Sequence, residues 1–155
     1  MTASRRHRDR GASLVEFALI LPVFALFIFA TIDFGHLYSQ DITVKNGARE
    51  GARSAAVGAA PADIQDAVLR SAANLEAADV QLAVRVQEAN HNAVLGDPGD
   101  EIVVCVKFPM RSLSGFMAPL LNGQLTSTST MRLEQPAAVG ASGYQTGGWT
   151  GTCAA

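Results

Sequence analysis

The chain has 155 residues, a hydrophobic content of 48% and a formal net charge of −2. This length allows one domain, with or without an additional anchor segment. The charge is uneven: the first ten residues carry four arginines against one aspartate, whereas the chain from Ala12 onward carries eight Lys and Arg against thirteen Asp and Glu. The acidic remainder argues against a basic surface for nucleic acid.

The first element that we expect is one long helix over residues 12–59, preceded by a polar, disordered and removable leader at residues 1–11. No residue in the stretch 17–32 is charged. The apolar run that begins at Ala12 extends about 31 Å as a helix, which is close to the hydrocarbon thickness of a bilayer, about 30 Å. We therefore predict a membrane span at about residues 12–33.

Charges on the two sides of this span predict its orientation. The arginines precede it and acidic residues follow it, which places the leader in the cytoplasm and the rest of the chain outside. Pro22 lies within the span and predicts a mild kink, because proline removes a backbone donor. At the outer end we expect Asp33 and His36 to face water or headgroups, with pairing between them as the alternative.

Glu16 is the most informative residue of the apolar run. A carboxylate inside a membrane is costly and usually has a partner. It lies five residues after Gly11, and a cut after Gly11 would create a new amino terminus at Ala12, one helical turn away. Gly11, Ala12 and Glu16 are therefore the predicted processing site.

The outer half of the long helix is rich in small residues. Gly47, Ala48, Gly51 and Ala52 recur at a spacing that permits close helix approach. Two interpretations stay open: contact with another subunit, or docking of an alanine-rich helix onto its own head. We predict these four residues as a helix-packing site.

Residues 61–135 are expected to form a small α+β head. The apolar positions within 62–78 have a helical period, whereas those of 80–86 alternate as in a half-buried strand. Two further strands are predicted at 102–108 and 125–133. The sequence thus predicts one additional helix and a three-stranded antiparallel sheet.

Two segments of this head are harder to interpret. Residues 109–123 repeat apolar side chains at helical spacing around Pro119, and we expect a short helix that fills the core, with a membrane or subunit contact as the alternative. Residues 136–155 are rich in Gly, Ser, Thr and Ala and contain the only tryptophan, Trp149. They are predicted to be a flexible tail.

The two cysteines, Cys105 and Cys153, invite pairing if the head lies outside the cytoplasm. Cys105 falls on the strand face opposite to Val104 and Val106, so a disulfide would attach the tail to the sheet. A half-buried free thiol with a mobile tail thiol is the alternative.

The sequence contains no catalytic constellation. His7, His36 and His91 are scattered and lack the spacing of metal ligands. Its serines lack the motifs that accompany serine nucleophiles. We expect no enzyme activity, no metal, no cofactor and no small-molecule substrate.

Four sequence blocks in this order carry a family resemblance: GASLVEFALILPVF, IDFG, NGAREGARSAA and TSTSTMRLE, spread from about Gly11 to Glu134. A basic leader with a glycine and a glutamate at the fifth mature position resembles the prepilin signal. Together the blocks resemble the TadE-like family of tight-adherence pilus assembly proteins.

The resemblance implies a pseudopilin-like minor subunit in the assembly of a type IV-like pilus, held in the cytoplasmic membrane with its head outside. Its implied partners are the membrane, a prepilin peptidase and other pilus-assembly subunits. An exported or bitopic membrane-anchored binding protein unrelated to pili is the alternative; in the exported form residues 1–30 are a removed signal peptide.

Overall fold

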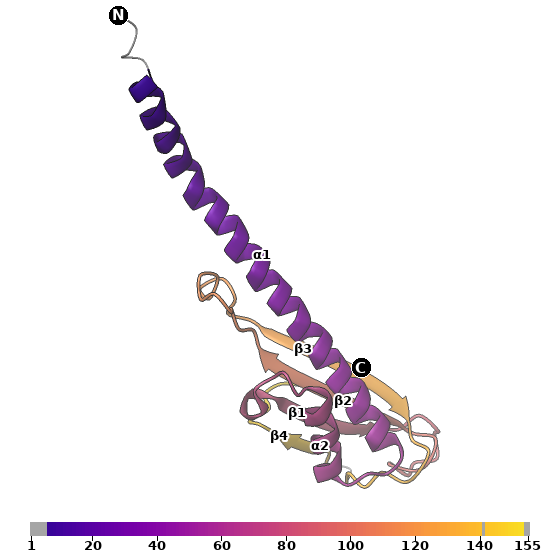
Figure 1. Cartoon of the computed structure of the whole chain (residues 1–155). Helices are drawn as coiled ribbons and strands as arrows, with labels where there is room; N and C mark the ends of the chain where they lie inside the picture. Colours follow the sequence, from indigo (N-terminus) through magenta and orange to yellow (C-terminus); the bar gives the residue numbers. More distant parts are fainter. Residues whose placement is uncertain (1–5, 141, 154–155) are drawn as a thin grey trace, which may run out of the picture.

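The computed structural model describes residues 6–140 and 142–153, with side chains from residue 11 onward. A long helix extends from a small head, which packs along one side of its C-terminal half (Figure 1). The head contains a second helix, a short 3-10 helix and one sheet. The elements are α1 (Arg6–Ala56), α2 (Pro61–Ser71), η1 (Ala77–Asp79), β1 (Gln81–Gln87), β2 (Glu101–Pro109), β3 (Gln124–Arg132) and β4 (Tyr144–Thr146).

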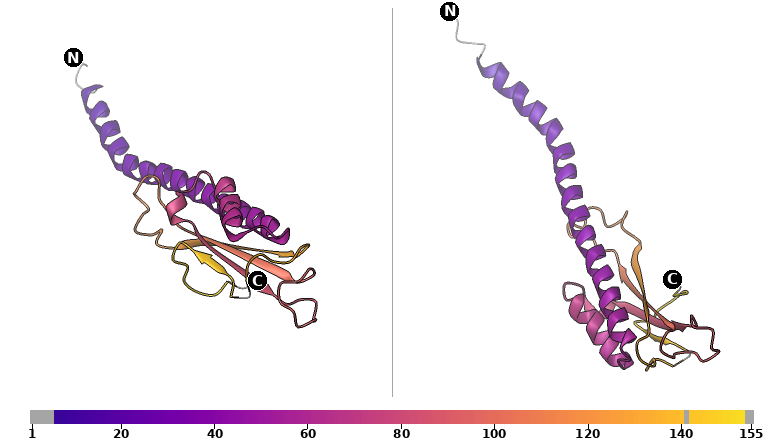
Figure 2. Two further views of the ribbon diagram at one scale, coloured as in Figure 1. Left: turned by 90° about the horizontal axis from the view of Figure 1, so that it is seen from below. Right: turned by 90° about the vertical axis from the view of Figure 1, so that its right-hand side faces the viewer.

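Helix α1 has 51 residues, which corresponds to a length of about 76 Å. It begins inside the segment expected to be a disordered leader, so that expectation is wrong for residues 6–11; residues 1–5 lie outside the described chain. The helix bends along its length (Figure 2), and Pro22 within it supplies a physical cause. It ends at Ala56, three residues before the expected end, and Gly58 follows with a positive φ of 77°.

The sheet has four strands, not the expected three, in the order β3-β2-β1-β4. All neighbouring pairs are antiparallel. The additional strand, β4, comes from the predicted flexible tail and pairs with the free edge of β1, for example Leu82 with Thr146. Its three residues are too few to show an alternating pattern, so the pairing is decided by the exposed edge and not by local sequence.

The main core lies between the sheet and the two helices, which cover the same face (Figures 1 and 2). On that face the central strands β1 and β2 contribute fully buried aliphatic residues, while α1 contributes mainly alanines and α2 contributes Ile64 and Val68. Helix α2 ends at Ser71, earlier than the expected 78, yet Leu75 still reaches the core from the following turn. The apolar spacing therefore predicts the burial of Leu75 correctly, although the helix ends before this residue.

The opposite face of the sheet carries a smaller core formed with the chain end. A disulfide joins Cys105 of β2 to Cys153, and Trp149 packs in the same cluster. The Nζ atom of Lys107 lies 4.0 Å from the centre of the Trp149 ring, within the range of a cation–π interaction. The described part of the tail is thus packed on the sheet, in contrast to the expected flexible segment; residues 141, 154 and 155 lie outside the described chain.

Two glycines make this close packing of the tail possible. A Cβ atom on Gly143 would lie 2.6 Å from the carbonyl oxygen of Val84, and one on Gly147 would lie 2.8 Å from that of Val80. Both glycines also have positive φ angles. Glycine is therefore required at both ends of β4 for conformation and for space, although a glycine-rich tail resembles a flexible linker in sequence.

The loop between β1 and β2, at the end of the sheet far from the N-terminal half of α1, is organised by Asp100. This carboxylate is completely buried. Its Oδ1 atom accepts hydrogen bonds from the N–H groups of Ala89 (3.0 Å) and Asn90 (3.3 Å), and its Oδ2 atom accepts one from Gly96 (2.8 Å). These N–H groups, Ala89 first, lower the pKa of Asp100 although burial opposes them.

The lowered pKa predicts acid sensitivity of the head. A carboxyl group whose pKa is lower in the folded state stabilises the fold above its unfolded pKa, about 3.9, and this contribution is lost as the pH falls through the folded-state pKa. D100N should lower the free energy of unfolding at neutral pH, and its difference from the parent should shrink below about pH 4.

The measurement is denaturant unfolding of the full chain in detergent, followed by Trp149 fluorescence at several pH values. D66N is the matched control, because Asp66 is exposed on α2. Equal pH profiles for D100N and D66N would contradict the assigned role of Asp100.

Candidate functional site

The N-terminal half of α1 stands clear of the head. From Gly11 to Ile32 no residue is buried, and the most apolar window of the helix has a mean hydropathy of 2.5 with none of it buried in the protein. By length and composition this helix can cross a membrane. An apolar surface of this size favours a nonaqueous environment, which suggests a single-pass membrane anchor.

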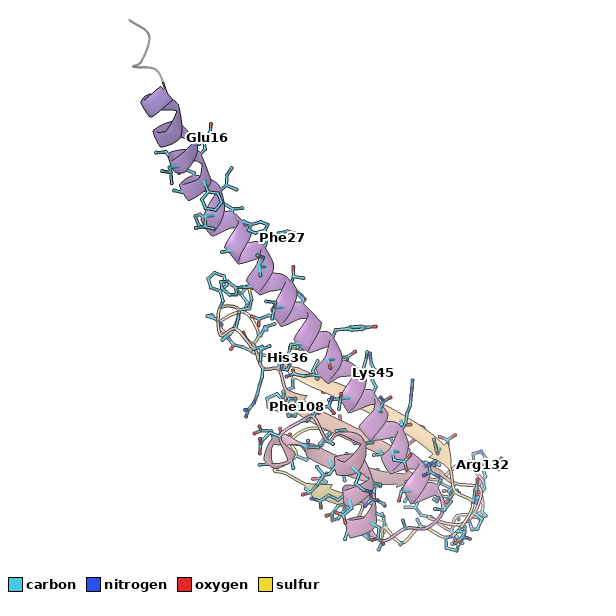
Figure 3. All side chains as sticks on the ribbon, viewed as in Figure 1. Glu16, Phe27, His36, Lys45, Phe108 and Arg132 are labelled. Carbon is cyan, nitrogen blue, oxygen red and sulfur yellow. A yellow bond between two sulfur atoms is a disulfide. The ribbon has the colours of Figure 1, made fainter. Side chains whose placement is uncertain are left out.

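Glu16 projects from this apolar segment (Figure 3). Its side chain is exposed and has no hydrogen-bond or ion-pair partner among the residues described in the structure. Ala12 lies one turn before it in the same helix. A Cβ atom added to Gly11 would meet no described atom within 4 Å.

Asp33 marks the junction between this segment and the head. Its carboxylate is 1% exposed and is bound by the loop between β2 and β3 (residues 110–123, the β2–β3 loop). The hydroxyl groups of Ser112 and Ser114 donate to Oδ2, each at 2.7 Å. The backbone N–H groups of Leu113 (3.0 Å) and Ser114 (2.8 Å) donate to Oδ1.

This arrangement corrects the expectation for Asp33 and His36. Asp33 does not face water and does not pair with His36; instead the Nε2 atoms of His36 and Gln40 lie 2.9 Å apart. Sequence reasoning missed the role of Asp33 because its partners are about eighty residues away. The available signal was the serine pair of the β2–β3 loop, whose donors match a carboxylate.

The β2–β3 loop also differs from its prediction as a core-filling helix. It forms no helix, and the side chains of Leu113, Phe116 and Leu120 are exposed. The ring of Phe116 stacks on Phe29 of α1, with 6.1 Å between the ring centres. The apolar spacing within the loop therefore serves a surface along α1 and not the core. At its base Arg111 pairs with Asp79.

The small residues of α1 bring the helix close to the head of the same chain. Ala48 and Ala52 are completely buried. A Cβ atom on Gly51 would lie 2.6 Å from Cγ2 of Val68 in α2 and 3.1 Å from Cγ1 of Val104 in β2. Gly47 faces the same helix, with its Cβ position 3.4 Å from Cγ1 of Val68. In the structure these residues lie in the contact between α1 and the head of the same chain, which we call the dock.

The comparison with known families concerns this same helix. Residues 11–53 match the family model described as TadE-like protein. The resemblance to this family is confirmed over residues 11–53; the last of the four sequence blocks that carry it, residues 126–134, lies outside the match. The TadE-like segment starts at Gly11 and ends near the end of α1, so it contains both the membrane anchor and the dock. No curated protein and no solved structure matches the chain.

The TadE-like match suggests involvement in tight-adherence pilus assembly. The described features of the protein agree with this suggestion. They are apolar surfaces, a close contact between α1 and the head, and carboxylates that bind backbone donors. Within the described residues no group of three or more His, Cys, Asp and Glu is placed to hold a metal ion.

The dock at Gly51 generates a stability prediction. In G51A the new methyl group overlaps Val68, and the cost of overpacking a core is about 1–3 kcal/mol. G35A is the matched control, because a Cβ atom on Gly35 of the same helix meets nothing within 4 Å. Both variants gain the same helix propensity, up to about 1 kcal/mol.

The difference between the free energies of unfolding of G51A and G35A, measured with denaturant in detergent, isolates the packing cost. We expect G51A to be the less stable by about 1–3 kcal/mol. Equal stabilities would show that α1 does not approach the head as closely as the structure indicates.

Proposed function

We propose that this protein is a membrane-anchored, pseudopilin-like minor subunit that takes part in the assembly of a tight-adherence pilus. The observation that carries the proposal is the TadE-like helix α1, whose C-terminal half contributes to the core of the head while its N-terminal half exposes a long apolar surface that contains Glu16. Such a helix suits either a bilayer or a bundle of like helices. The protein acts by packing and not by catalysis.

In this proposal a prepilin peptidase removes the basic leader after Gly11. The support is the spacing from Gly11 to Glu16, the arginines that precede it and the start of the family match at Gly11. In the structure α1 continues through this site, so cleavage requires local unwinding. Glycine assists, because it weakens a helix by about 1 kcal/mol relative to alanine.

The processing step predicts the mass of the mature chain. Mass spectrometry of protein isolated from its native membrane should show Ala12 as the first residue. G11V should accumulate as the unprocessed precursor in the same membrane fraction, because a branched side chain replaces the open glycine. An intact Met1 terminus in functional protein would reject the proposed processing.

The same mass discriminates the alternatives. A start near Thr31 would remove the apolar segment and indicate an exported binding protein, whereas the intact chain in membranes would indicate a bitopic protein that is never cleaved. The contact of Phe29 with Phe116 favours retention of the segment, because a cut near Thr31 would remove one member of this stacked pair.

Glu16 is proposed to act in assembly. Its carboxylate neutralises the ammonium group of Ala12, in its own chain or in a neighbouring subunit, and pairing lowers the cost of holding either charge in an apolar environment. Between subunits such a pair also defines the axial register, since one offset brings the two charges together. The exposure of Glu16 and its lack of a partner among the described residues leave it available for this role.

E16A should therefore keep the Ala12 terminus and membrane insertion but reduce the amount of pilus recovered by shearing, and E16D should cause a partial loss. The matched control is E76A, which removes an exposed glutamate of the head. If E16A assembles and adheres like E76A, Glu16 has no role in register.

A further inference from the structure

The β2–β3 loop presents an apolar surface that the proposed function leaves unexplained. Leu113, Phe116 and Leu120 are exposed over 63%, 52% and 74% of their surfaces. No residue of the segment 112–123 is charged. The β1–β2 loop differs, because its exposed Val94 stands among ionisable residues.

The position of the β2–β3 loop points to what covers it. The loop runs beside the middle of α1 and extends from the head toward the N-terminal half of that helix (Figures 1 and 3). Phe116 stacks on Phe29, which lies four residues, or about 6 Å along the helix axis, before Asp33. If the span ends at about residue 33, the ring of Phe116 lies at the same depth as apolar residues inside the bilayer.

Most backbone N–H groups of the loop tip are paired, which lowers the cost of entering lipid, where unpaired N–H groups are costly. Asp33 accepts two of them, and the hydroxyl groups of Ser112 and Ser114 accept two more. Three others donate to carbonyl oxygens within the loop. The N–H groups paired in these ways are those of residues 113–116, Ala118, Leu120 and Leu121, and Pro119 has none.

We propose that the β2–β3 loop inserts its apolar tip into the leaflet on the head side of the bilayer, beside α1, as a second membrane contact. The inference rests on the proposed membrane anchoring of α1. Lipid is favoured over a second copy of the chain because the loop surface continues the surface of the span. The ion pair of Arg111 with Asp79 remains at the base of the loop, on the head side.

A second contact restricts the head in a way that one helix does not. A single helix lets the head rotate about the helix axis, whereas a loop fixed to the same leaflet allows one orientation relative to the membrane. Asp33 connects the two contacts, because its carboxylate holds the loop against α1. The device would present one defined face of the head to partners in the envelope.

Fluorescence quenching by lipid tests this inference on the full chain. The protein is reconstituted into phosphatidylcholine vesicles with or without bromine atoms on the acyl chains. Each variant adds one tryptophan to the single Trp149 of the parent, so that the parent supplies the baseline. The variants are F116W and L120W in the loop, I28W in the span and V94W in the β1–β2 loop.

F116W, L120W and I28W should lose fluorescence in brominated vesicles to a similar extent, while V94W should behave like the parent. L120W is included because F116W changes one ring of the Phe29–Phe116 pair, whereas Leu120 is largely exposed and lies outside that pair. If I28W is quenched and both loop variants are not, the loop lies outside the lipid and the inference fails, although anchoring stands.

In that outcome, protection of F116W from acrylamide in water would indicate that a protein surface covers the loop. If I28W is also unquenched, α1 does not enter the bilayer, and the proposed anchoring and this inference fail together.

Discussion

The close approach of α1 to the sheet is the constraint on which the rest of the structure depends. Small residues occupy the contact face of the helix, and at Gly51 the space that a methyl group would need is already filled by Val68 and Val104. This dock makes the second half of α1 a core element of the head. Because the same helix continues without interruption to Arg6, it also joins the head directly to the apolar segment.

Two buried carboxylates organise the loops at opposite ends of the sheet. Asp33 binds the β2–β3 loop through four donors, and Asp100 binds the β1–β2 loop through three backbone N–H groups. In both cases a short side chain replaces the partners that an irregular loop lacks. Hydrogen bonds to every oxygen of these carboxylates offset the cost of burying their charge.

The C-terminal segment covers the second face of the sheet. The helices occupy one face, so a head of this size has little apolar material left for the other. The chain end supplies it with Trp149, the Cys105–Cys153 disulfide and the edge strand β4. Strand β4 also protects the edge of β1, which would otherwise offer unpaired backbone groups to other chains.

The sequence by itself determined the features that depend on local patterns. The uncharged run predicts the long helix with its apolar half, alternating apolar residues predict β1, and the sequence blocks resemble the TadE-like family, whose model matches residues 11–53. These features follow from periodicity and composition, which are properties of neighbouring residues.

Only the tertiary structure decided the features that join distant segments. Nothing near Asp33 indicates that serines about eighty residues later will bind it, and a three-residue strand such as β4 forms because an edge is available. The glycines around β4 resemble a linker in sequence but serve close packing against β1. The apolar spacing of the β2–β3 loop likewise specifies an apolar surface without specifying what it faces, because that depends on where Asp33 holds the loop against α1.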